Sequence, residues 1–243
     1  MFLPYCRSQE KISDGFKAAF DYLKNFDPEH DADERLWKTR HKTVVRYTVP
    51  RGVLPEKEDY QVVWKYYLEK RFFRYLFRPS LAFREWKGYK NVEALGIPCA
   101  KVLAAAENRR GARLLNSTFV TEMVKCDGDG DDFCPGGKLE HDKELAREFA
   151  GKNLRWLAKL HKNNFVHGGF TPRNELYILT PDSASEQLHV VWLDLATCRK
   201  APFFKRKKLQ KKDVDCFLSA LDLPPDIEAG LHKIYLEELK KNG

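Results

Sequence analysis

Two segments in the first third of the chain carry the clearest strand pattern. "HKTVVRYTV" (41–49) and "YQVVWKYY" (60–67) are rich in β-branched and aromatic residues, which favour strands. "STFVTEMV" (117–124) has the same character. The Pro- and Gly-containing segment 50–59 predicts a loop, and "DGFKAAFDYLKNF" (14–26) predicts a helix. The N-terminal part is therefore predicted to be rich in sheet.

The segment 80–95, "SLAFREWKGYKNVEAL", predicts a helix. Ser80 is a favourable N-cap, and Gly96 with the proline that soon follows is a favourable stop. The apolar residues that recur at helical spacing are Ala82, Trp86, Tyr89 and Val92. Glu85 lies on the same inward stripe, where a carboxylate is costly unless it is paired. We therefore expect Glu85 to have a partner.

The second half of the chain alternates long helical patterns with short strands. The segment 142–161 predicts a helix, with an apolar stripe made of Leu145, Phe149, Trp156 and Leu160. Strand-like runs follow at 175–179 and 188–195, and the chain is amphipathic and helical from about residue 213. This order predicts the α+β class, with a sheet-rich N-terminal part and a helix-rich C-terminal part.

The composition is that of a soluble globular protein, with 43% apolar and 32% charged residues. No run of about 18 apolar residues occurs, so no membrane-spanning helix is predicted. The N-terminus is too polar after Tyr5 for a secretion signal. The six cysteines are scattered without a CxxC pair, which predicts neither a zinc site nor a disulfide framework. We therefore expect a cytoplasmic protein.

The net charge of +8 favours phosphate-rich partners, and part of it is local. "FFKRKKLQKK" (203–212) is strongly basic and begins with two aromatic residues. This segment could contact a membrane surface or an anionic substrate. The alternative is that it is a solvated helix start or loop. A nucleic-acid partner is disfavoured, because no aromatic-plus-glycine recognition motif accompanies the charge.

An acidic segment, "CDGDGDD" (126–132), resembles the start of a calcium loop. The position of the closing Glu is Lys138, and Asp132 stands where the loop needs Gly. We therefore interpret this segment as a solvated loop.

The segment 165–179, "FVHGGFTPRNELYIL", has the spacing of a kinase catalytic loop, in which His-x-Asp is followed by an Asn. His167 and Asn174 occupy two of these positions, but the Asp position is Gly169. No acidic residue lies between His167 and Asn174, and Glu175 is expected to point elsewhere. Loss of a general base typically lowers the rate by about 10² to 10⁴. Because the transition state of phosphoryl transfer is loose, some activity can survive this loss.

Three more residues would complete a phosphotransferase site. Lys65 lies inside an apolar strand, Glu85 lies on the next helix, and Asp194 ends the predicted strand "VVWLDL". Kinases use a strand Lys to hold phosphates, a helix Glu to pair with that Lys, and an Asn and an Asp to bind metal. The order of these residues along the chain is the kinase order.

The chain has no GxGxxG motif to cover the phosphates. The turn in its place would be "WKTRHKTVV", where Arg40, His41 and Lys42 can supply donors to phosphate.

These motifs resemble the lipopolysaccharide kinase family (Kdo/WaaP type), which phosphorylates sugars of the lipopolysaccharide inner core. The resemblance runs from about residue 36 to about 220. It is strongest in "RPSLAFREWKGYKNVEALGIPCAKVLAAAE" (78–107), and it includes "FVHGGFTPRN" and "VVWLDLATCR".

The resemblance implies a bilobal protein-kinase-like fold that uses ATP and Mg²⁺. It implies that Lys65 is the ATP lysine and Glu85 its partner, and that Asn174 and Asp194 are the metal ligands. It also implies that the backbone around Glu122 is the hinge that meets adenine. Gly169 falls on the family's catalytic Asp. The acceptor would be an anionic core sugar at the cytoplasmic face of the inner membrane, where the basic segment 203–212 could contact the bilayer.

We expect one kinase-like domain over residues 1–243, with an N-lobe at about 36–122 and a C-lobe at about 123–243. Three alternatives are open. The chain could be a pseudokinase that binds nucleotide or a partner without transfer, a basic nucleic-acid-binding module, or an α+β domain in which the motif matches carry no chemistry.

Overall fold

The computed structural model describes most of the chain. Its described residues are 2–5 (backbone only), 27, 30–50, 60–68, 75, 78–110, 112–181 and 186–241. The predicted helix at 14–26 and nearly all of the predicted loop at 50–59 lie outside the described residues.

The chain divides into two compact units. The first consists of residues 1–87 and 100–124, and the second of residues 88–99 and 125–243. The division falls within one helix, α2 (Leu81–Ala94).

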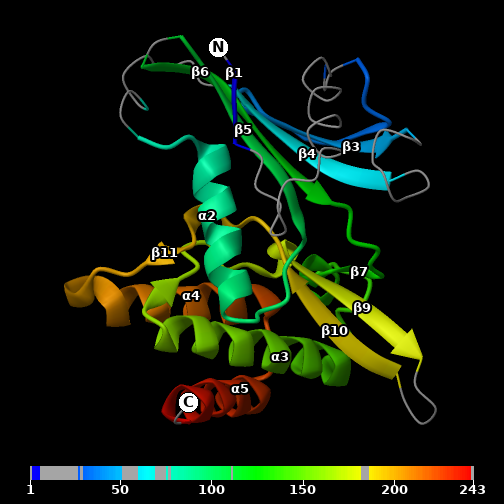
Figure 1. Cartoon of the computed structure of the whole chain (residues 1–243). Helices are drawn as coiled ribbons and strands as arrows, with labels where there is room; N and C mark the ends of the chain where they lie inside the picture. The colour runs from blue at the N-terminus through cyan, green and yellow to red at the C-terminus, as the bar shows by residue number, and fades with distance from the viewer. Residues whose placement is uncertain are drawn as a thin grey trace. The chain divides into compact units, whose positions relative to one another are not determined.

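A six-stranded antiparallel sheet forms the first unit (Figure 1), in the order β1-β5-β6-β4-β3-β2. Its strands are β1 (Phe2–Tyr5), β2 (Glu34–Lys38), β3 (Lys42–Val49), β4 (Tyr60–Leu68), β5 (Val102–Arg110) and β6 (Arg113–Glu122). The predicted strands at 41–49 and 60–67 are confirmed. The strand predicted at 117–124 begins earlier and ends two residues sooner.

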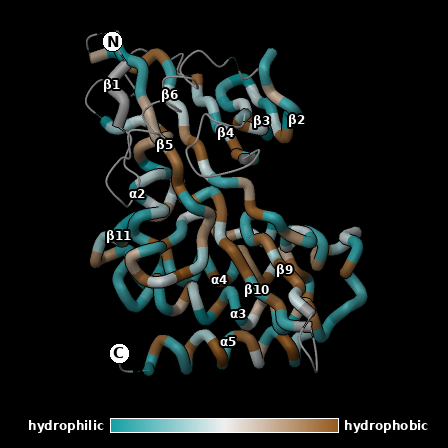
Figure 2. The backbone as a smooth tube through the Cα atoms, turned by 45° about the vertical axis from the view of Figure 1, so that its right-hand side comes forward, coloured by the Kyte–Doolittle hydropathy of each residue, from teal (hydrophilic) through white to brown (hydrophobic). Residues whose placement is uncertain are grey.

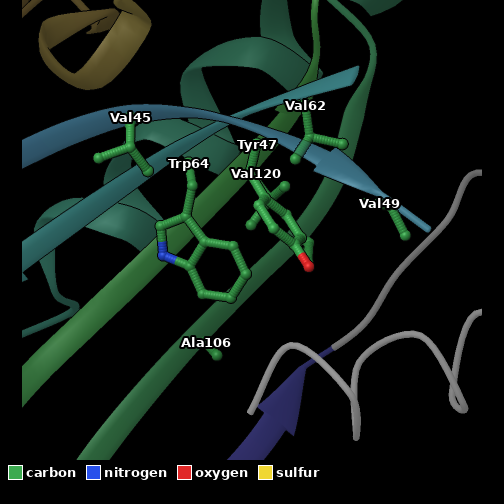
Figure 3. Close-up of a cluster of buried hydrophobic side chains, with 8 residues drawn as sticks. Val45, Tyr47, Val49, Val62, Trp64, Ala106 and Val120 are labelled. Atoms are coloured by element: carbon green, nitrogen blue, oxygen red, sulfur yellow. The ribbon is translucent and has the colours of Figure 1, made fainter. Parts of the chain in front are cut away.

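One face of this sheet carries the hydrophobic cluster drawn in Figure 3. Successive side chains of a strand point to opposite faces, so the cluster takes every second residue of β3 and β4. Its members are Val45, Tyr47, Val49, Val62, Trp64, Ala104, Ala106 and Val120. Lys65 and Tyr67 alternate with these residues and therefore point to the opposite face.

Helix α2 has the ends that the sequence predicts. The Ser80 hydroxyl accepts a hydrogen bond from Phe83 N at 3.2 Å, as an N-cap does. Gly96 has a φ of +64°, a left-handed conformation that favours glycine at a helix end. The inward position of Glu85 is confirmed, since its side chain is 0% exposed.

The second unit holds the longer helices. They are α3 (Lys143–Lys162), α4 (Arg206–Leu221) and α5 (Pro225–Lys240), and α3 packs against α5. Figure 2 shows apolar and polar turns alternating along α5, as expected for a helix with one buried face. None of the described helices is both long and apolar enough to span a membrane.

Short strands complete the second unit. A three-stranded sheet has the order β10-β9-β7, with β7 (Gly128–Asp129), β9 (Glu175–Pro181) and β10 (Glu186–Trp192). Strand β8 (Phe165–Val166) pairs with β11 (Arg199–Lys200). Short 3-10 turns lie between these strands, namely η1 (Gly130–Phe133), η2 (Pro172–Asn174) and η3 (Leu195–Thr197), and η4 (Phe203–Lys205) lies between β11 and α4.

Three sequence predictions for the second unit need correction. The strand predicted at 188–195 stops at Trp192, so Asp194 lies beyond the strand and adopts a left-handed conformation. The helical region predicted from about 213 begins at Arg206, which makes the basic segment 203–212 a helix start. In the predicted stripe of α3, Phe149 and Leu160 are fully buried, but Leu145 and Trp156 are only partly buried.

The acidic segment 126–132, expected to be a solvated loop, contains β7 and most of η1. The Asp129 carboxylate caps η1, and Asp132 pairs with Lys138 at 3.1 Å. Within the described residues, no group of three or more His, Cys, Asp or Glu side chains is arranged to hold a metal ion.

Candidate active site

A buried ion pair lies on the face of the first unit's sheet opposite the hydrophobic cluster. Lys65 Nζ is 2.5 Å from Glu85 Oε1, and the Tyr67 hydroxyl donates to Glu85 Oε2 at 2.5 Å. Lys65 and Tyr67 are two residues apart on β4, so both reach the same helix residue. The predicted pairing of Lys65 with Glu85 is confirmed, and the carboxylate is charge-compensated at 0% exposure.

The turn between β2 and β3 is held by a threonine. The Thr39 hydroxyl accepts hydrogen bonds from Lys42 N at 3.1 Å and from His41 N at 3.3 Å. Arg40 and His41 are exposed on this turn. Lys42 pairs with Tyr67 across the strands, and its Nζ lies 5.8 Å from the Tyr67 ring centroid. A second cation thus lies near the ring of Tyr67, the residue that donates to Glu85. A contact of this turn with phosphate stays a prediction.

Glu122 is the last residue of β6, two residues before the first unit ends at Val124. Its backbone N–H donates to Lys101 O at 2.9 Å, and that of Met123 donates to Gln61 O at 2.9 Å. Contact of this segment with adenine stays a prediction.

In the second unit, one carboxylate holds the segment that resembles a catalytic loop. Asp213 accepts hydrogen bonds from the backbone N–H groups of His167 at 2.8 Å and of Gly168 at 2.9 Å. It also lies 3.2 Å from His161 Nε2, and His161 Nδ1 lies 2.7 Å from the Tyr235 hydroxyl. Asp213 is the main residue that the sequence analysis missed, since it had only been part of a predicted helix.

The His167 side chain is fully buried among aromatic rings. Its ring centroid lies 5.2 Å from that of Phe170 and 5.6 Å from that of Trp192. Neither ring nitrogen has a hydrogen-bond partner. Burial lowers the pKa of His167 to about 4, so the ring is neutral at pH 7. His167 therefore packs inside the loop as a neutral ring, and its role in catalysis stays a prediction.

Gly169 occupies an exposed position in this loop. Among the described residues, the atom that a Cβ added there would meet within 4 Å is Thr197 Oγ1, at 3.4 Å, which is an ordinary contact. The loop around it is held by Asn174, whose Nδ2 donates to Gly169 O at 3.3 Å and to Thr171 Oγ1 at 3.2 Å. The structure therefore has room for a side chain at residue 169.

A backbone hydrogen bond joins Asn174 to the residue before Asp194. The N–H of Leu193 donates to Asn174 O at 2.7 Å. Asp194 has a φ of +49°, and the next residue, Leu195, lies against α2. A Cβ at Gly88 would lie 2.0 Å from Leu195 O, so only glycine at this position of α2 permits the approach.

Glu175 follows Asn174 directly, and its side chain is buried. Its side chain is 0% exposed, and neither carboxylate oxygen has a hydrogen-bond partner. Burial raises the pKa of Glu175 well above its ordinary value. The group is therefore sequestered from any acceptor hydroxyl.

A family model for the Lipopolysaccharide kinase (Kdo/WaaP) family matches residues 57–234, which is most of the chain. The chain belongs to this family. No curated protein matches the sequence.

Two solved structures show the fold of this lipopolysaccharide kinase family member. A structure of WaaP in complex with acyl carrier protein is 19% identical with a TM-score of 0.64, over 90% of this chain and 86% of that one. A Rio2 kinase from Chaetomium thermophilum, in an ADP/Mg²⁺-phosphoaspartate complex, is 15% identical with a TM-score of 0.55, over 99% of this chain and 73% of that one. The predicted protein-kinase-like α+β fold is thereby confirmed.

The residues present fit the ATP and Mg²⁺ that a lipopolysaccharide kinase implies. Lys65 is a cation fixed by a buried carboxylate, which suits a phosphate contact. Asn174 uses its amide nitrogen in both of its hydrogen bonds, so its Oδ1 is the atom suited to a metal. Carboxylate and amide oxygens are hard ligands of the kind that Mg²⁺ takes. Lys65 and Glu85 both lie in the first unit, and Asn174 and Asp194 both lie in the second.

Proposed function

We propose that this protein is an ATP-dependent phosphotransferase that acts on a sugar of the lipopolysaccharide inner core. The observation that carries this proposal is the buried Lys65–Glu85 pair, at 2.5 Å in a kinase-like fold. Lys65 would hold ATP phosphates in the orientation set by Glu85, while Asn174 and Asp194 would hold Mg²⁺. The bound metal would neutralise the charge that develops on the transferred phosphoryl group.

Gly169 limits what this chain can contribute to proton removal. Two titratable side chains near it in sequence are not suited to act as a base, because Glu175 is buried and His167 is neutral and enclosed. Catalysis would therefore depend on positioning and on charge neutralisation, which are the larger contributions in phosphoryl transfer. We expect slow turnover, lower by about 10² to 10⁴ than with a base.

The nucleotide site is tested by the thermal shift that ATP produces with and without Mg²⁺. We expect a saturable shift that needs the metal and is lost in Asp194→Asn. Lys65→Met should weaken ATP binding by well over tenfold, while Lys101→Met, which changes an exposed lysine of the same unit, should bind normally. Equal affinity of Lys65→Met and wild type would refute the assignment of the site.

The alternative is a pseudokinase, and Gly169 is the observation that favours it. Phosphate transfer from ATP to a lipopolysaccharide core acceptor separates the two functions. Turnover by the wild type would exclude the pseudokinase. The pseudokinase would be supported if the wild type binds ATP without turnover and only the Gly169→Asp variant transfers phosphate. The space at residue 169 makes that substitution sterically acceptable.

An acceptor anchored in a membrane would bring this enzyme to the membrane surface. We therefore include peripheral contact with the cytoplasmic face of the inner membrane, through the basic segment 203–212, in the proposed function.

A further inference from the structure

The whole net charge of the protein is equal to that of one short segment. Residues 199–212, "RKAPFFKRKKLQKK", contain eight basic and no acidic residues. The complete chain has 43 basic and 35 acidic residues, so the remainder of the chain is formally neutral. From here on, the basic segment means residues 199–212, which adds the four residues before Phe203 to the segment 203–212 named above. A charge this concentrated attracts anionic surfaces over about a Debye length of 8–10 Å.

Two phenylalanines stand at the centre of the basic segment, on the turn before α4. Phe203 is 84% exposed and Phe204 is 81% exposed, the largest values among the described large hydrophobic residues. Removal of such rings from water is favourable by about 25 cal/mol per Å² of apolar surface. Both rings are turned into solvent, so they are available to enter an apolar environment outside the described protein.

Each exposed ring has a cation beside it. Lys205 Nζ lies 5.5 Å from the Phe204 ring centroid, and the Arg206 guanidinium carbon lies 5.4 Å from that of Phe203. An aromatic ring next to a basic side chain suits the boundary between lipid headgroups and acyl chains, where the ring enters the apolar layer and the cation meets phosphate.

The first turns of α4 extend the cationic surface. The buried face of α4 is formed by Val214, Phe217, Leu218 and Leu221. Lys207, Lys208 and Lys212 are exposed near its N-terminus. Lys211 is exposed too but is paired with Asp215 at 2.6 Å. These lysine side chains are therefore already at the surface, where they can contact an anionic partner.

We propose that the basic segment docks on an anionic lipid bilayer, with Phe203 and Phe204 inserted below the headgroups. A bilayer fits better than an acidic protein because the apolar element is a narrow tip of two rings within a field of lysines, and not a broad apolar patch with a polar rim. Two weak contributions acting together, ring insertion and electrostatic attraction, are what stable but reversible membrane attachment requires.

This inference deepens the proposed function by naming the surface to which the kinase attaches, and it rests on that function for its biological setting. Its test uses neither nucleotide nor acceptor. Failure of membrane binding and failure of phosphate transfer are therefore separate results.

The test is co-sedimentation of the full chain with vesicles of phosphatidylcholine alone or of phosphatidylcholine mixed equally with phosphatidylglycerol. We expect binding to the anionic vesicles only, weakened by salt. Changing both rings, Phe203→Ser with Phe204→Ser, should lower binding about tenfold. Charge reversal, Lys207→Glu with Lys208→Glu, should lower it at least as far.

Matched controls lie on α5. Leu236→Ser removes an exposed apolar side chain, 51% exposed, and Lys233→Glu with Lys240→Glu reverses two exposed charges. These variants should bind like the wild type, and all variants should keep the wild-type melting temperature, because the altered residues are exposed.

Three results would overturn the proposal: no binding to anionic vesicles, equal loss in the α5 controls, or full binding by the double Phe variant. In the last case the lysines alone would bind a polyanion, and an acidic protein or nucleic acid would replace the bilayer as the partner. A loss of vesicle binding in the double Phe variant with wild-type melting supports insertion of the rings.

Discussion

Removal of Lys65 is expected to destabilise the first unit more than removal of the whole ion pair. In Lys65→Met, the Glu85 carboxylate keeps the Tyr67 hydroxyl but loses the cation 2.5 Å away, at 0% exposure. Breaking a buried pair by removing one partner typically costs about 3–5 kcal/mol, because it leaves a buried charge uncompensated. At about 2–4 °C per kcal/mol for a chain of this size, the melting temperature should fall by roughly 10 °C.

The double variant Lys65→Met with Glu85→Leu has neither charge. Replacement of a buried ion pair by apolar residues of similar volume is often neutral or stabilising by about 1–4 kcal/mol. We therefore expect the free energy of unfolding of the double variant to be within about 1 kcal/mol of the wild-type value, or higher. The coupling energy between the two sites should be about 3 kcal/mol or more, far beyond the ~0.5 kcal/mol seen for independent sites.

The measurement is urea unfolding of wild type, both single variants and the double variant, followed by circular dichroism and completed as a double-mutant cycle. Lys101→Met is the control for loss of an exposed lysine in the same unit and should change stability by less than about 0.5 kcal/mol. If the two single effects simply add in the double variant, the pair is not energetically coupled and the reasoning is refuted. A double variant that is stable but does not bind ATP would show that the pair is retained for function.

Three further predictions concern the second unit. Stability should fall as pH decreases from about 6.5 to about 4, because the unfolded state takes up a proton on His167 while the folded state, with a His167 pKa of about 4, does not. This proton uptake lowers the stability by ~3 kcal/mol across that pH range. His167→Phe should remove this pH dependence from the melting temperature; the same loss of stability in acid as in the wild type would contradict the burial argument. Glu175→Leu should stabilise the protein by about 1–3 kcal/mol, since it replaces an unpartnered buried carboxyl group, and chemical denaturation that showed a loss instead would mean that Glu175 has a partner. Asp213→Asn should cost about 2–4 kcal/mol in the same measurement, because it weakens charge-assisted bonds to two backbone N–H groups, whereas Asp215→Asn on the exposed side of α4 should change little.

Local patterns in the sequence were sufficient to predict the elements that carry the first half of the site. Strands β3 and β4 have a buried face and therefore an apolar pattern, and Ser80 and Gly96 mark the ends of α2 through their own backbone preferences. Strand β2 was not predicted. It is an edge strand whose five residues are all exposed, so no apolar alternation marks it.

The residues that the sequence analysis missed or misplaced depend on contacts between distant parts of the chain. Asp213 binds N–H groups 45 and 46 residues earlier, and no local pattern records such a contact. Asp194 was placed at a strand end, but strand pairing stops at Trp192 and a left-handed residue follows. The spacing around His167 likewise does not reveal that the rings of Phe170 and Trp192 pack against its side chain.

The loop around Gly169 is held by contacts that do not involve a side chain at residue 169. Asp213 binds the backbone of His167 and Gly168, and Asn174 binds the backbone oxygen of Gly169. None of these bonds uses a side chain at residue 169, so the loop does not need one to hold its shape. In the proposed site, a carboxylate at residue 169 would act only on the acceptor hydroxyl, while the Lys65–Glu85 pair and the contacts of Asn174 are independent of such a side chain. Substitution at this position should therefore change turnover and leave nucleotide affinity and stability nearly unchanged, which separates the loss of a base from the loss of a binding site.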